Sequence, residues 1–171
     1  FRHGPAGNPA LMATAHASPG AKLLRLWQRL APWPGGRWLF SRILGRMVPY
    51  TGTISPRIRE LRPGYARVEL RDRRRVRNHL NSIHAIALAN LGEVTSGLAM
   101  LTGLPSNARG IAVKISTEYF KKARGLLVAE TRCEVPQVQG EDMEYVVQAD
   151  IRDRDGDVVA RTTANWRLGP V

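Results

Sequence analysis

The chain has 171 residues, 43% of them hydrophobic, a formal net charge of +12 and a single cysteine, Cys133. This hydrophobic content excludes a disordered tail, and no apolar run reaches the roughly 18 residues that span a bilayer. Because one cysteine forms neither an internal disulfide nor the core of a zinc site, we expect a cytoplasmic protein without a metal.

The first 49 residues are expected to lie outside the main domain. Residues 1–20 are rich in Gly, Pro, Ala and His, which predicts a mobile segment. Two short helices follow over about 21–31 and 37–47, where apolar residues recur at helical spacing. Pro32 and Pro49 are expected to end them, so residues 21–49 form an N-terminal helical extension.

From residue 50 onward, alternating apolar residues predict strands on both sides of one long helix. Two strands, about 53–61 and 65–70, form a hairpin through Arg62-Pro63-Gly64. The helix, about 83–102, is apolar on almost every side and is therefore expected to be buried. Four strand segments follow, over about 111–120, 126–135, 144–153 and 158–168.

The order of these elements predicts an α+β fold. Ala123-Arg124-Gly125 is expected to turn the first pair of the four later strands, and Asp155-Gly156 the last pair. A curved antiparallel sheet wrapped around one long central helix is the simplest way to bury a helix that is apolar all round. We therefore predict one such domain over residues 50–171, preceded by two short helices.

Glu93 lies in the middle of the predicted buried helix. A buried carboxylate costs several kcal/mol unless it is paired or protonated. No Lys or Arg stands three or four residues away on either side. Such a departure from good packing is typical of a functional residue, although Glu93 facing solvent or an arginine of a strand is an equally weighted alternative.

The predicted start of the same helix is a candidate site for negative charge. Asn81 or Ser82 is expected to cap the helix, which leaves the N–H groups near His84 and Ala85 free, as in an oxyanion hole. His84 and Glu93 are separated by about 13.5 Å along the helix axis. A site that uses both groups therefore requires Glu93 of one subunit beside Ala85 of the partner subunit.

These residues resemble a known motif. The spacing Asn78-x-x-Asn81-x-x-His84, followed by Glu93 and then Gly97, is similar to that of PaaI-like hotdog thioesterases. The wording His-Ala-x-x-Leu-x-Asn-Leu-x-Glu is most similar to the DUF4442 group. The resemblance covers about residues 50–168. It implies a hotdog fold and a homodimer or tetramer. It also implies hydrolysis of an acyl thioester of coenzyme A or of acyl carrier protein. Coenzyme A would then be part of the substrate, and no other cofactor is expected.

The resemblance also implies roles for individual residues. Glu93 would act as general base or nucleophile, the Ala85 N–H would polarise the thioester carbonyl, and Asn78 would orient water or the thioester. His84 would hold the loop or assist polarisation. The expected substrate pocket contains Asn81, Ile86, Gly97, Tyr119 and Phe120. Ala85 and Ile86 replace two glycines of the family motif, which favours a non-catalytic acyl-CoA-binding protein as the alternative.

Basic residues are concentrated in the first half of the chain. Residues 1–80 carry 16 basic and three acidic side chains, against 10 and 11 in residues 81–171. The expected contacts to coenzyme A phosphates or an acidic carrier protein are Arg73, Arg74, Arg75, Arg77, Lys121 and Lys122, with a solvated strand end as the alternative. Nucleic-acid binding is not favoured, because no aromatic platform or zinc signature accompanies the charge. Membrane contact through residues 21–31 is not favoured either. A hydratase or dehydratase of the same fold is not favoured because His79 stands where that family has Asp.

Overall fold

The computed structural model describes residues 18–135, 137, 138 and 140–170. Residues 1–17 of the predicted mobile segment lie outside the described residues, whereas residues 18–20 form the start of a helix. The helices are α1 (Pro19–Leu30), α2 (Gly36–Met47), α3 (Pro49–Ile54) and α4 (Ala85–Leu101), with a short 3₁₀ helix at Arg74–Val76. The strands are β1 (Arg57–Arg62), β2 (Tyr65–Arg71), β3 (Ala108–Tyr119), β4 (Leu126–Arg132), β5 (Met143–Arg152) and β6 (Val158–Pro170).

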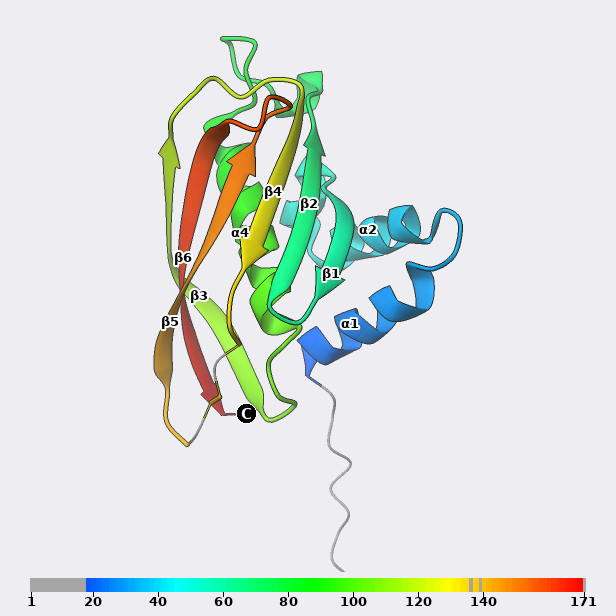
Figure 1. The fold of residues 1–171 in the computed structure, drawn as a ribbon, viewed down its shortest axis with the longest axis vertical. Helices are drawn as coiled ribbons and strands as arrows, with labels where there is room; N and C mark the ends of the chain where they lie inside the picture. The colour runs from blue at the N-terminus through cyan, green and yellow to red at the C-terminus, as the bar shows by residue number, and fades with distance from the viewer. Residues whose placement is uncertain (1–17, 136, 139, 171) are drawn as a thin grey trace, which may run out of the picture.

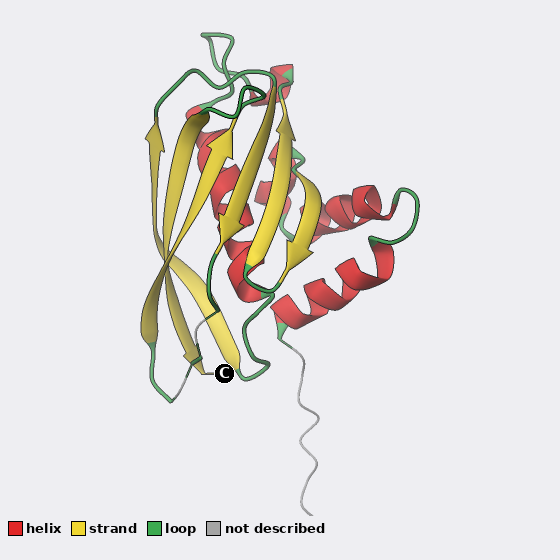
Figure 2. Ribbon diagram, viewed as in Figure 1, coloured by secondary structure: helices red, strands yellow, loops and turns green. Residues whose placement is uncertain are grey.

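Within the described residues, six strands form one antiparallel sheet in the order β1-β2-β4-β5-β6-β3. Helix α4 lies along one face of this sheet, and α1 and α2 lie beyond the β1 edge, away from β3 (Figure 1). The colouring of Figure 2 shows the same single strand layer with all helices on one side. The predicted curved sheet around one long helix is confirmed.

Helix α4 lies close to the sheet because it has small residues where strands approach. Gly92 faces β6, and a Cβ atom at this position would stand 2.1 Å from the Thr162 hydroxyl. Leu91 and Met100 of the helix are fully buried. Helix α1 meets the far end of α4, where a Cβ on Gly20 would stand 1.9 Å from the Leu101 carbonyl oxygen. The sheet and α1 therefore lie directly against α4 and cover most of its surface, which is why the helix is apolar on nearly all sides.

The structure corrects two local predictions. Residues 53 and 54 belong to helix α3 rather than to a strand, because Pro49 fits the first turn of a new helix after ending α2. Strand β1 therefore begins at Arg57. Strand β3 pairs with β6 instead of β4, so Ala123-Arg124-Gly125 is a connection across the sheet and not a hairpin.

The other two predicted hairpins are confirmed. Strands β1 and β2 are joined at Gly64, which has a φ of 74°, and β5 and β6 at Gly156, which has a φ of 87°. Both values lie in the left-handed region that glycine adopts without strain. No helix of the described part is both long enough and apolar enough to cross a membrane.

Candidate functional site

Helix α4 begins at Ala85, and His84 is its N-cap. The His84 Nδ1 atom accepts a hydrogen bond from the Ile86 N–H at 3.1 Å, while the His84 N–H donates to the Val76 carbonyl at 2.7 Å. The prediction that Asn81 or Ser82 caps the helix was wrong. Those residues belong to a separate turn before the helix. The backbone N–H of His84 joins the helix start to Val76, and its imidazole caps the first turn of the helix.

Asn78 organises the turn before the helix. Its Oδ1 atom accepts hydrogen bonds from the N–H groups of Leu80, at 2.9 Å, and Ser82, at 3.2 Å. Asn81 adopts a left-handed conformation with a φ of 53°. Asn is one of the few residues that tolerate this conformation, which accounts for its presence at this position. Both asparagines thus shape the loop that leads into α4.

The backbone of Ala85 is partly exposed at the positive end of α4. Its N–H has no hydrogen-bond acceptor among the described residues, and its carbonyl accepts from the Tyr119 hydroxyl at 3.0 Å. The structure therefore brings Tyr119, at the end of β3, to the helix start. A free N–H at a helix N-terminus is suited to stabilise a developing oxyanion.

Glu93 lies on the exposed stripe of α4. Within the first nine residues of the helix, only Ala85, Ile86, Ala89 and Glu93 are accessible, and their spacing places them along one side. The half-buried Glu93 carboxylate makes no hydrogen bond or ion pair with any described residue, and burial raises its pKa above the ordinary 4.5. Eight residues separate it from Ala85, which is about 12 Å along the axis.

A cavity of about 260 Å³ opens beside the start of α4. Tyr50, Arg75, His84, Ile86 and Asn90 are among its lining residues. The Asn90 side chain donates to the Tyr50 carbonyl at 3.2 Å and so connects α4 to α3. Ile86 is 53% exposed and stands at this cavity, where the family motif has a smaller residue. The residues on either side of Ala85, His84 and Ile86, thus both line this cavity.

The other residues predicted for the pocket are placed differently. Gly97 is buried against the indole of Trp166, to which a Cβ would stand 3.2 Å away, so its role is helix–sheet packing. Phe120 is 57% exposed just after β3. It is not among the residues that line the cavity beside α4.

The predicted phosphate-binding residues do not form one cluster. Arg77 is paired with Asp72 at 2.6 Å, and Lys121 with Asp153 and Asp157 at 2.7 and 2.6 Å. These charges already have partners. Arg74 and Lys122 are exposed.

Arg73 and Arg75 line two different cavities, one on either side of α3. The cavity that Arg73 lines has a volume of about 370 Å³ and also contains Arg42, Arg46, Arg57 and Arg71. Sequence reasoning missed those four arginines. The only signal for them was the basic excess of the first half of the chain.

Strand β3 is an edge strand with apolar side chains exposed. Ile111 is 66% exposed, and Val113 and Ile115 are 44% and 47% exposed. The strand has 12 residues and pairs on one side only, with β6. A long apolar edge is a site for pairing with another chain. It lies beside the exposed stripe of α4, as the bond from Tyr119 to Ala85 shows.

Comparisons with known proteins agree with this architecture. Residues 36–168 match the family described as Domain of unknown function (DUF4442), and no curated protein matches the sequence. A structural-genomics crystal structure without a stated function is 29% identical, with a TM-score of 0.74 over 89% of this chain and 99% of its own.

Two solved structures described in thioesterase terms share the fold. A Pseudomonas aeruginosa protein of unknown function, described as a probable thioesterase, is 23% identical with a TM-score of 0.69, over 77% of this chain and 93% of its own. A thioesterase family protein from Silicibacter pomeroyi is 18% identical with a TM-score of 0.64, over 77% and 96%. The chain therefore belongs to the DUF4442 family and has the hotdog fold of these thioesterase-family structures.

Proposed function

We propose that this protein hydrolyses acyl thioesters of coenzyme A or of an acyl carrier protein at a site shared by two subunits. The observation that carries the proposal is the Glu93 carboxylate. It is half-buried on the accessible stripe of α4, and within the described chain it has no partner. Raised pKa values caused by desolvation are typical of catalytic acids and bases.

A second subunit supplies the missing half of the site. Glu93 and Ala85 are about 12 Å apart along one helix, too far to act on the same carbonyl. Pairing β3 with the same strand of a second copy would cover Ile111, Val113 and Ile115 and extend the sheet across both subunits. The α4 helices would then lie side by side, with Glu93 of one beside Ala85 of the partner subunit.

Each group then has a step in hydrolysis. The Ala85 N–H donates to the thioester carbonyl, while the Glu93 carboxylate accepts a proton from water as the water oxygen bonds to the carbonyl carbon. The tetrahedral intermediate expels the thiolate, which takes the proton back from Glu93. The side-chain amide of Asn78 orients the water or the thioester. His84 acts by holding the helix start, since its Nδ1 already accepts from Ile86.

One observation favours acyl-CoA binding without turnover as the second candidate. Ile86 is 53% exposed beside the Ala85 N–H, in the position of a motif glycine. A side chain there narrows the approach to the N–H without closing the neighbouring cavity. This candidate predicts tight acyl-CoA binding and no hydrolysis by the native protein.

Ala85→Pro tests the proposed oxyanion donor directly. Proline removes the N–H, and it is well tolerated at the first position of a helix. The preceding His84 has φ −65° and ψ 140°, the extended conformation that a following proline requires. We expect a fall in kcat of about 100-fold or more on an acyl-CoA substrate. Ala85→Gly retains the N–H and is the matched control, expected to keep most of the activity.

The dimer is tested with Ile115→Lys, which places a charge on the exposed edge of β3. We expect a monomer in sedimentation analysis and loss of turnover together. Wild-type turnover in Ala85→Pro, or in a monomeric Ile115→Lys variant, would contradict the proposed site. Acyl-CoA binding by a native protein that hydrolyses none of a panel of short, long and aromatic thioesters would establish the binding protein instead.

A further inference from the structure

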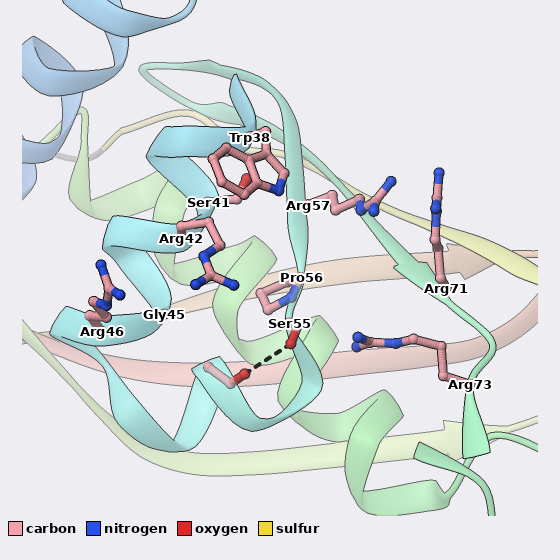
Figure 3. A pocket seen from close by; sticks show the side chains of 11 residues that line it. Trp38, Ser41, Arg42, Gly45, Arg46, Ser55, Pro56, Arg57, Arg71 and Arg73 are labelled. Carbon is pink, nitrogen blue, oxygen red and sulfur yellow. Dashed lines mark hydrogen bonds between the residues drawn. The ribbon is translucent and has the colours of Figure 1, made fainter. Parts of the chain in front are cut away.

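The larger cavity is lined by positive charge. It has a volume of about 370 Å³, within the range of ligand sites, and lies between α2, α3, the start of β1 and the end of β2. Figure 3 shows Arg42 and Arg46 on the α2 side and Arg57, Arg71 and Arg73 on the strand side. No acidic residue is among the lining residues.

The nearest acids of the same strands are engaged elsewhere. Glu69, which stands opposite Arg57 in the β1–β2 pairing, binds Arg59 at 2.7 Å. Asp72, next to Arg71 in the chain, binds Arg77 at 2.6 Å. Within the described residues, none of the five lining arginines forms an ion pair.

The arginines are also crowded against one another. Burial and the neighbouring charges of Arg71, Arg59 and, least, Arg73 lower the pKa of Arg57, and the opposing effect of Glu69 does not outweigh them. Like charges held together without counter-ions destabilise a fold. An arrangement of this kind is expected where an anionic ligand supplies the compensating charge.

Direct contacts hold the walls of the cavity together and fix one of its arginines. Arg73 donates through Nη2 to the Ile54 carbonyl at 2.6 Å, while its buried Nε has no partner. Helices α2 and α3 touch at two glycines, and a Cβ on Gly52 would stand 2.2 Å from the Gly45 carbonyl oxygen. The Ser41 hydroxyl accepts from the β1 backbone at 3.0 Å and so joins α2 to the strand.

We propose that this cavity binds a phosphate group. Planar guanidinium groups donate paired hydrogen bonds to phosphate oxygens, and arginine is the preferred residue for this recognition. Five arginines without an acid suit a group with two negative charges better than a single carboxylate. The site is separate from the start of α4, and its existence does not depend on thioester hydrolysis.

Two sources can supply such a group. One is a soluble nucleotide, such as the adenosine 3′,5′-bisphosphate portion of coenzyme A, whose base would rest on Trp38 at the rim. The other is the headgroup of an anionic lipid. Trp38 at the cavity is 59% exposed, and Met47 and Val48 at the end of α2 are also exposed. The experiment therefore contains both probes.

Binding of inorganic pyrophosphate and adenosine 3′,5′-bisphosphate is measured by calorimetry, and binding to phosphatidylglycerol vesicles by co-sedimentation, with phosphatidylcholine vesicles as reference. The variants are Arg57→Gln and Arg71→Gln. Arg25→Gln on α1 is the matched control, because Arg25 is exposed and loses the same single charge. We expect about tenfold weaker binding of the soluble phosphates in each cavity variant and unchanged binding in the control.

The outcomes separate the sources. Arginine-dependent binding of the bisphosphate identifies a soluble ligand, whereas vesicle binding that requires Arg57 and Arg71, without binding of either soluble phosphate, identifies a lipid headgroup. If no probe binds, or if Arg25→Gln weakens binding as much as the cavity variants, the site is overturned. If Arg57→Gln or Arg71→Gln also lowers the midpoint of thermal unfolding, Arg42→Gln separates lost binding from lost stability. Arg42 is an exposed lining residue, and its replacement is expected to weaken binding while leaving the midpoint unchanged.

Discussion

Replacing Glu93 by Gln is expected to stabilise the fold and to lower the activity by about 100-fold or more. The carboxylate is half-buried without a partner, and burial raises its pKa above 4.5. Gln removes the negative charge, which is costly to bury without a partner, and because the side chain is partly exposed we expect a gain of only about 1 kcal/mol. For a chain of this length, a gain of about 1 kcal/mol raises the midpoint of thermal unfolding by about 2–4 °C.

The sign of the pH dependence follows from the direction of this shift. Because the pKa is higher in the folded state, the ionised carboxylate weakens folding, and this weakening develops as the pH rises from 4.5 through the folded pKa. The gain from Gln should therefore be present at pH 7 and disappear below pH 4.5. Urea unfolding of both proteins at pH 4 and pH 7, followed by circular dichroism, measures the difference.

Turnover is measured on the same preparations with an acyl-CoA substrate. A general base contributes about 100-fold or more, so Glu93→Gln should lose at least that factor, and native turnover should rise with pH as Glu93 ionises. Glu93→Asp keeps the charge and is the control. If Glu93→Gln is less stable than the native protein at pH 7, the carboxylate is a paired structural group. If the variant keeps its turnover, Glu93 is not the general base. Either result would refute the prediction.

Three further predictions concern the fold around the site. His84→Ala removes the acceptor of the Ile86 N–H and should cost about 1 kcal/mol in urea unfolding, whereas Asn at this position should preserve the cap. Gly92→Ala places a Cβ 2.1 Å from the Thr162 hydroxyl. The cost of this overpacking, about 1–3 kcal/mol, should exceed the gain in helix propensity, so calorimetry should show a lower midpoint of thermal unfolding. The hydrogen bond from Arg77 lowers the pKa of Asp72 below 3.8, so the ionised carboxylate stabilises the fold above pH 3.8, and this stabilisation is lost as the pH falls through the folded pKa. Asp72→Asn should therefore reduce the loss of stability that acid titration measures in this pH range. An unchanged loss would contradict the role assigned to Asp72.

The sequence alone determined the elements whose signals are local. A helix apolar on every side, with Glu93 in its middle, was recognisable because residue spacing reports burial directly. The glycine turns at Gly64 and Gly156 were equally local, since each requires a positive φ that few other residues adopt. The distance between Glu93 and the start of α4 also followed from helix geometry, and with it the need for a second subunit in any site that uses both.

Only the tertiary structure decided which segments meet. Alternation marked β3 as a strand but could not distinguish β6 from β4 as its partner, because the pairing depends on how the whole sheet closes over α4. The arginine cavity was not foreseen for the same reason. Arg42, Arg57 and Arg71 come from three different elements, and their proximity arises where α2 packs beside the edge of the sheet, a contact that periodicity does not report. Periodicity describes the environment of each residue, whereas a binding site depends on contacts between distant residues that the fold brings together.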